Sequence, residues 1–321
     1  MGTSHYSDDF YKDRTTDRIA RGVDAFEYDT AVRMGTKPKK VHDKLNPHGV
    51  IRESRDSTTH PKSKAIAVLF DVTGSMGGIP RRLQEKLPQL MGLLLRKALV
   101  QDPQILFGAV GDFFSDRVPL QIGQFESGIE MDDDLTNLVL EGGGGGSNKE
   151  SYQNGMYFLA RKTKIDCFEK RGEKGHVFLI GDEAPYDRAS MREIMELIGD
   201  TPQEDISTQR IVEELKERYH VFFIIPKGSS HGGAAWLSEV WTKLVGPQNV
   251  LVLDQPDGVC ECIAAAIGAI EGTLEDDVAS VLTDSGADRG VADSVARALD
   301  PLRRALVKTA TGSLPEKTGR S

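Results

Sequence analysis

Short, uninterrupted runs of apolar residues recur between residues 64 and 272 of the chain. The first run, Ala65–Phe70, is too short for a buried helix and contains branched Ile and Val side chains, which favour strands. We expect it to be a strand buried on both faces, as in a parallel sheet. Similar runs predict further strands over residues 105–114, 118–125, 176–180, 220–225 and 250–253.

Between these runs, apolar residues follow the spacing of amphipathic helices. The clearest series is Leu83, Leu87, Leu90, Leu94 and Ala98, in which Pro88 should introduce a bend. Further helices are predicted over residues 150–163, 188–198, 208–218, 233–244 and 259–271, with a short one near 135–139. Strands that alternate with helices predict an α/β fold. We expect a doubly wound, mostly parallel, Rossmann-like sheet with helices on both faces and one antiparallel edge strand.

The two ends of the chain lack this alternation. Residues 1–60 are polar and hold few periodic apolar positions, so we expect a mostly irregular N-terminal extension. Residues 61–272 form the predicted α/β domain. In the C-terminal extension, residues 273–321, apolar positions from Val291 to Leu306 predict an amphipathic helix, and the end from Leu314 is expected to be disordered.

The composition of the chain mainly excludes classes of function. The chain has 321 residues and a net charge of -9, without a dense basic stripe, so nucleic-acid binding is not expected. No apolar run is long enough for a membrane span, and the N-terminus lacks the apolar stretch of a secretory signal. The cysteines, Cys167, Cys260 and Cys262, form neither a disulfide framework nor a zinc spacing. We therefore expect a cytoplasmic protein with reduced thiols.

Candidate chemistry begins where the first predicted strand ends. Asp71, Thr73 and Ser75 follow this strand at two-residue intervals. In open α/β sheets, ligands bind beyond the carboxyl ends of the strands. Oxygen ligands without His or Cys suit Mg²⁺ better than zinc. A solvated Asp/Ser turn is the simpler structural alternative.

Two further loops carry oxygen ligands at predicted strand ends. The second loop contains the glycine run 142–146 followed by Ser147, Asn148 and Glu150, and the third contains Asp182 and Glu183. A doubly wound sheet would bring all three loops to one edge. A flexible glycine linker is the alternative for the second loop, although Ser147 or Asn148 could cap the helix that follows. For Asp112, at another strand end, a turn is a simpler role than a place beside a metal.

Together, the three loops resemble the von Willebrand factor A (VWA) domain. Asp71-x-Thr73-x-Ser75 is similar to that family's Asp-x-Ser/Thr-x-Ser metal-ion-dependent adhesion site (MIDAS), and Met76 is frequent after it in intracellular branches. The second loop resembles the family's Gly-Gly-Gly-Asp-x-Pro-Glu segment, with Ser147 replacing Asp, Lys149 replacing Pro and Glu150 retained. The third loop resembles Thr-Asp-Ala-Pro-Pro-His, which places Asp182 at the acidic position. The resemblance covers residues 64–272.

The resemblance implies a divalent cation, most often Mg²⁺, with Mn²⁺ or Ca²⁺ as alternatives, bound directly by the Thr73 and Ser75 hydroxyls. Asp71 and Asp182 would lie close to it, partly through water. Whether Ser147, Asn148 or Glu150 supplies the second-loop ligand is left open. An open coordination position would accept an Asp or Glu carboxylate of a partner protein. The residues expected to face that partner are Gly74, Met76, Gly146, Asn148 and Glu183.

These expectations favour a metal-dependent adaptor or scaffold over an enzyme. Intracellular VWA proteins often serve AAA+ ATPases of the MoxR or chelatase type, or stress and conflict systems, and this chain has no P-loop of its own. A Mg²⁺-dependent phosphohydrolase with Asp71 as nucleophile would need a second Asp where Thr73 stands. The acidic charge weighs against the third alternative, a ribonucleoprotein-associated subunit.

Overall fold

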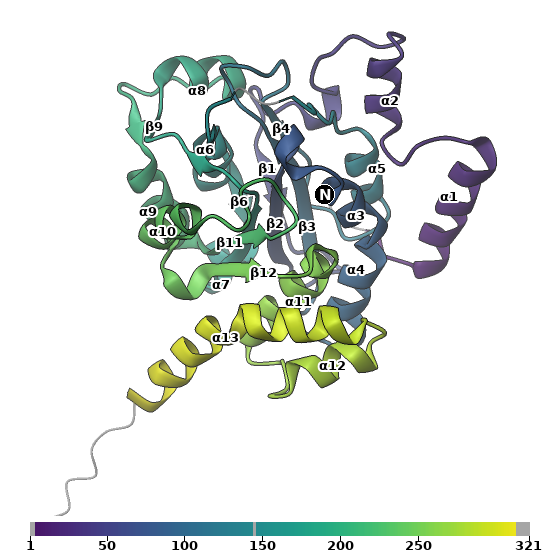
Figure 1. Cartoon of the computed structure of the whole chain (residues 1–321), viewed down its shortest axis with the longest axis vertical. Helices are drawn as coiled ribbons and strands as arrows, with labels where there is room; N and C mark the ends of the chain where they lie inside the picture. The colour runs from purple at the N-terminus through teal and green to yellow at the C-terminus, as the bar shows by residue number, and fades with distance from the viewer. Residues whose placement is uncertain (1–3, 144–145, 313–321) are drawn as a thin grey trace, which may run out of the picture.

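A six-stranded sheet forms the centre of the computed structural model, which describes residues 4–143 and 146–312 (Figure 1). The strand order is β12-β11-β7-β2-β3-β4, and all neighbours are parallel except β3 and β4. The strands are β2 (Lys64–Asp71), β3 (Pro103–Val110), β4 (Leu120–Ile122), β7 (Gly175–Ile180), β11 (Tyr219–Pro226) and β12 (Val250–Leu253). The predicted mixed α/β class, with a mostly parallel sheet and an antiparallel edge strand, is confirmed.

Strand β2 lies in the middle of the sheet, and all eight of its residues are buried. Because successive side chains point to opposite faces, the strand contributes to two separate apolar cores. Ile66, Val68 and Phe70 belong to the first core, whereas Ala67 and Leu69 belong to the second. This double burial explains the continuous apolar run in the sequence.

Helices cover the sheet on each side (Figure 1). The first core is packed by α3 (Ile79–Glu85), α4 (Leu87–Arg96), α5 (Glu130–Thr136), α11 (Val259–Glu271), α12 (Val278–Asp284) and α13 (Arg289–Gly312). The second is packed by α6 (Tyr152–Arg161), α7 (Asp166–Arg171), α8 (Met191–Ile198), α9 (Thr208–Arg218) and α10 (Ala235–Val245). No helix within the described residues is long and apolar enough to cross a membrane.

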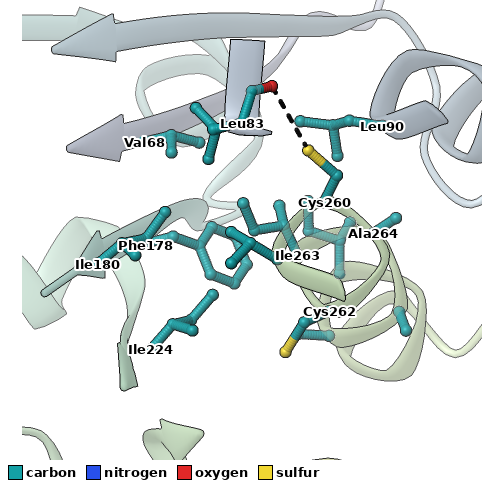
Figure 2. Close-up of a cluster of buried hydrophobic side chains, with 14 of the residues drawn as sticks. Val68, Leu83, Leu90, Phe178, Ile180, Ile224, Cys260, Cys262, Ile263 and Ala264 are labelled. Carbon is teal, nitrogen blue, oxygen red and sulfur yellow. Dashed lines mark hydrogen bonds between the residues drawn. The ribbon is translucent and has the colours of Figure 1, made fainter. Parts of the chain in front are cut away.

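Figure 2 shows the first core where α11 meets the sheet. Ile263 of α11 faces Phe178 and other strand side chains, and the Cys260 thiol donates to the Leu83 carbonyl over 3.9 Å. All three cysteines are buried and free, as expected from their spacing. They therefore act as small apolar core residues.

Several predicted boundaries differ from the observed ones. The helix expected through Ala98 is divided at Lys86 into α3 and α4, so the bend expected at Pro88 occurs as a break just before it. The strand expected over residues 105–114 ends at Val110, because residues 112–116 form a hydrogen-bonded turn, and the strand expected over residues 118–125 covers only Leu120–Ile122. The helix expected from Glu150 begins at Tyr152, since Lys149 and Glu150 form the short strand β5.

The N-terminal extension contains more regular structure than the sequence indicated. It contains α1 (Asp8–Arg21), α2 (Glu27–Arg33), the short helix η1 (Asp43–Leu45) and β1 (Arg52–Ser54), which pairs with β6 (Thr163–Ile165). Polar contacts fix α1 to the domain. The Arg18 guanidinium lies 2.6 Å from buried Asp132, and the Tyr11 hydroxyl donates to the Gln84 carbonyl over 2.7 Å. The spacing of apolar residues, from which the elements were predicted, contains no information about such polar contacts.

The amphipathic helix predicted from Val291 to Leu306 lies within α13, which packs against the sheet. Val295 and Leu299 of α13 are fully buried in the first core, together with residues of α11. The end that we expected to be disordered, from Leu314, lies outside the described residues. The remaining short elements are β8 (Ala184–Pro185), β9 (Arg188–Ala189), β10 (Ile206–Ser207), η2 (Gly74–Met76), η3 (Pro247–Asn249) and η4 (Pro256–Gly258).

Candidate functional site

Asp71 is the last residue of the central strand β2, and its side chain is fully buried. Its Oδ1 accepts hydrogen bonds from the Thr73 backbone N–H over 2.7 Å and from the Thr73 hydroxyl over 2.6 Å. This Asx-type turn follows from an Asp placed two residues before a residue with a free N–H. On the other side, the Tyr152 hydroxyl donates to Asp71 Oδ2 over 3.3 Å.

The first and third loops meet through Ser75. The Ser75 hydroxyl lies 3.1 Å from the Thr73 hydroxyl and donates to Asp182 Oδ1 over 2.8 Å. Asp182 follows β7, the neighbour of β2 in the sheet, and is fully buried. Its Oδ2 accepts from the backbone N–H of His231, which lies in the loop after β11. Three strand-end loops thus converge on Asp182.

The start of the glycine run lies against the first loop. Gly142 donates its N–H to the Val72 carbonyl over 3.2 Å, and the Gly74 N–H donates to the Gly143 carbonyl over 2.6 Å. A Cβ on Gly74 would lie 3.1 Å from the Gly142 oxygen, so a larger residue there would require Gly142 to shift slightly. Of the glycine run, residues 144 and 145 lie outside the described residues.

The second loop delivers Glu150 to the site. Lys149 and Glu150 form β5, which pairs in parallel with β8 directly after Glu183. Oxygen atoms of Asp71, Glu150 and Glu183 all lie within 4.8 Å of one another. Glu150 is 1% exposed, and its Oε2 has no hydrogen-bond partner. A buried carboxyl oxygen without a partner is unfavourable unless a proton or a cation binds it.

Burial also changes the proton affinity of this cluster. It raises the pKa of Asp71 to about 7, an effect that the Thr73 hydrogen bonds oppose and the charges of Asp182 and Glu183 reinforce. Burial together with the neighbouring carboxylates raises the pKa of Glu150, and burial raises the pKa of Glu183. The site therefore favours added positive charge.

The structure brings together six of the residues predicted from the sequence: Asp71, Thr73, Ser75, Glu150, Asp182 and Glu183. All offer oxygen atoms, which suit Mg²⁺, Mn²⁺ or Ca²⁺ rather than zinc. The unpartnered Glu150 oxygen fits a bound cation. These residues can therefore hold a divalent ion at the carboxyl ends of β2 and β7.

The other predicted residues lie differently. Ser147 is exposed, and its hydroxyl faces the Lys149 carbonyl and the Tyr186 hydroxyl. Gly146 and Asn148 are also exposed, and the Asn148 carbonyl accepts from the Ala184 N–H. Met76 is a correction, because it is 1% exposed and packs in the first core, so its side chain does not face a partner.

The sequence did not reveal that Tyr152 and His231 contact the site, whereas the role of Asp112 was predicted correctly. Tyr152 was considered only as part of a helix, and His231 only as a structural histidine, although their hydroxyl and backbone N–H contact the site carboxylates. A hydroxyl on the first residue of a helix after a strand-end loop was the available signal for Tyr152. Asp112 has the predicted turn role, since it accepts from the Ser115 hydroxyl and the Phe114 N–H.

The sequence matches no protein-family model and no curated protein. Among solved structures, the pilus adhesin SpaC from Lactobacillus rhamnosus GG in its open conformation is similar, with 10% identity and a TM-score of 0.46 over 71% of this chain and 33% of that chain. Proximal thread matrix protein 1 from the mussel byssus has 10% identity and a TM-score of 0.42 over 70% of this chain and 47% of that one. The chain thus spans less than half of either protein, and this likeness says nothing about function.

Proposed function

We propose that the chain is a VWA-type domain that binds a divalent cation at the ends of β2 and β7 and, through it, a carboxylate group of a partner protein. In the strand order, the chain proceeds outwards from β2 first towards β4 and then towards β12, which supports a doubly wound, Rossmann-like layout. The point where the direction reverses lies between β2 and β7. Ligands of open α/β sheets bind at that point.

The observation that carries the proposal is the connected set of oxygen atoms from Asp71 through Thr73 and Ser75 to Asp182. The Thr73 and Ser75 hydroxyls would hold the cation directly, and the carboxylates of Asp71 and Asp182 would orient those hydroxyls and bind the cation themselves, partly through water. When bound, the cation supplies a Lewis-acidic position that accepts a carboxylate oxygen.

Exposure decides the side from which a partner would approach. Asp71 and Asp182 are fully buried, whereas Gly74 is exposed and Ser75 is partly exposed. A partner's Asp or Glu would therefore reach the cation past Gly74 and Ser75. An adaptor of this kind suits a separate AAA+ ATPase or a stress-response assembly as its partner, and the cytoplasm as its compartment.

The contacts of Asp71 favour this binding role over phosphoryl transfer. An aspartyl nucleophile of the dehalogenase type works with a general acid two residues later, and that position is occupied by Thr73, whose hydroxyl donates to Asp71 itself. A threonine hydroxyl ionises far too weakly for this role at neutral pH. The chain is therefore proposed to bind and not to catalyse.

Water-proton relaxation of the Mn²⁺-loaded protein tests the open coordination position. Acetate or an aspartate-containing peptide should displace water from bound Mn²⁺ and lower the relaxation enhancement, whereas acetamide, which lacks the charge, should not. Ser75→Ala should weaken Mn²⁺ binding. The matched control is Asp134→Asn, which alters a buried carboxyl group outside the cluster and should behave like wild type. If neither acetate nor the peptide lowers the relaxation enhancement of bound Mn²⁺, the proposed role is refuted.

A further inference from the structure

Four carboxyl groups converge at the ends of β2 and β7, on Asp71, Glu150, Asp182 and Glu183. Among the described residues, no lysine or arginine forms an ion pair with any of them. The nearest cationic candidate is His231, whose Nδ1 lies 3.8 Å from Asp182 Oδ2 and 3.8 Å from Glu183 Oε1. The charge of this cluster is therefore largely uncompensated by the protein itself.

One divalent cation would not balance this set. Four ionised carboxylates around a single M²⁺ leave two negative charges in a region where three of the residues are 0–1% exposed. Buried charges without partners are strongly unfavourable, so further positive charge is needed there. Either protons on the carboxyl groups or a second divalent cation would supply it, and the spacing of the oxygen atoms favours the cation.

The geometry divides the oxygen atoms into two groups that share Asp71. The first group is the hydrogen-bonded series from Asp71 to Asp182 described above. The second comprises Asp71, Glu150 and Glu183, whose oxygens lie within 4.8 Å of one another. Oxygen ligands bind Ca²⁺ at about 2.3–2.6 Å, and Mg²⁺ at slightly shorter distances, so ligands of one ion lie up to about 5 Å apart. The second group matches that spacing.

An independent observation points to a ligand in the second group. Glu150 is 1% exposed, yet its Oε2 has no hydrogen-bond partner, although this atom has lone pairs to satisfy. Its partners in the group, Asp71 and Glu183, are also carboxyl groups, so only a proton shared with one of them or a cation can satisfy it. A cation among the three would satisfy the Glu150 oxygen and remove the repulsion.

We infer that the chain binds two divalent cations side by side, the first at Asp71, Thr73, Ser75 and Asp182 and the second at Asp71, Glu150 and Glu183. The first position rests on the proposed function, and the second is an addition to it. Three carboxylates make the second position richer in anionic ligands, which suits Mn²⁺ or Ca²⁺. Glu150 thereby takes the ligand role of the second loop, and Glu183 acts as a ligand instead of facing a partner.

Equilibrium dialysis against Mn²⁺, followed by metal analysis, measures the number of ions bound to the full chain. Wild type should bind two Mn²⁺. Glu183→Gln and Glu150→Gln should each bind one, and so should Ser75→Ala, because it alters only the first position. Asp71→Asn should lose both. The matched control is Asp187→Asn, which removes an acid whose side chain is 88% exposed and should leave two.

Electron paramagnetic resonance of wild type gives a readout that does not depend on the folding of any variant. Two Mn²⁺ ions bridged by Asp71 should show exchange coupling once the second ion binds, whereas a single ion should give an isolated six-line signal. One bound Mn²⁺ that is lost in Ser75→Ala and unaffected by Glu183→Gln would overturn the second position but preserve the proposed function. No saturable Mn²⁺ binding in wild type would contradict both.

Discussion

Asp71 is the residue on which the candidate site depends most, because it ends the central strand and touches both groups of oxygen ligands. Its carboxyl group is fully buried among other acids, and the charges of Asp182 and Glu183 act against its ionisation. Without a cation, this arrangement opposes folding. With a cation, the same carboxylates become ligands.

Asp71→Asn should therefore stabilise the protein in the presence of EDTA. The amide keeps an oxygen that can accept from Thr73, and it removes one of the clustered negative charges. A gain of about 1 kcal/mol would raise the midpoint of thermal unfolding by about 2 °C. A lower midpoint than wild type in EDTA would show that the carboxylate cluster does not oppose folding.

Asp134, which lies away from the candidate site, makes the stability of the fold depend on pH. It is 7% exposed, and burial raises its pKa to about 7, against the opposing effects of its hydrogen bond from Gln124 and the charge of Arg52. Between about pH 4 and about pH 7 the folded protein holds a proton that the unfolded chain has released. Its contribution to stability therefore falls as pH rises, by up to about 1.4 kcal/mol per pH unit.

Asp134→Asn should flatten this part of the pH profile. Urea unfolding in EDTA at about pH 5, 6 and 7 should show the variant gaining stability relative to wild type as pH rises. Exposed Asp187→Asn serves as the control and should parallel wild type. If the stabilities of Asp134→Asn and wild type change with pH in the same way, the pKa of Asp134 is not raised in the folded protein.

The roles of single residues were most predictable where several oxygen-bearing residues stand at fixed spacing in one loop. Asp71, Thr73 and Ser75 stand at fixed spacing, so they could be identified from the sequence. The choice among Ser147, Asn148 and Glu150 could not be made, because it depends on the pairing of β5 with β8, which turns Glu150 inwards and leaves Ser147 exposed. The burial of Met76 depends likewise on the path of η2.

At the scale of elements, the first loop packs closely against the start of the glycine run. Gly74→Ala would place a Cβ 3.1 Å from the Gly142 oxygen and 3.2 Å from the Gly143 oxygen, so the glycine run must shift. We expect about tenfold weaker Mn²⁺ binding, equivalent to about 1.4 kcal/mol. Gly78→Ala is the matched control, since its Cβ would meet no heavy atom within 4 Å. Equal affinities in dialysis would show that this contact is not required.

Elements with strong apolar periodicity were predicted well, and polar elements were not. The strand over residues 250–253 and the helix over residues 259–271 have the predicted bounds, because continuous apolar runs determine both. Helix α1 was missed because an ion pair and a hydrogen bond from a hydroxyl group hold it against the domain. Such contacts depend on partners more than 70 residues away, which a local pattern does not contain.

At the scale of the whole molecule, the C-terminal helices belong to the same core as the sheet. Leu299 of α13 is fully buried in the first core, so Leu299→Ala should destabilise the entire domain by about 2–5 kcal/mol in one cooperative urea transition. Val307→Ala, on the same helix, is the control, because Val307 is 62% exposed and its loss should change stability by less than about 0.5 kcal/mol. A separate early transition in Leu299→Ala would mean that α13 folds independently.

Thermal unfolding of the full chain with Mg²⁺ or with EDTA shows whether the ends of β2 and β7 form a divalent-cation site. We expect a saturable rise in the unfolding midpoint with Mg²⁺ for wild type and for Asp134→Asn, and no rise for Asp71→Asn. A wild-type midpoint that is the same in Mg²⁺ and in EDTA, or a rise that persists in Asp71→Asn, would contradict such a site.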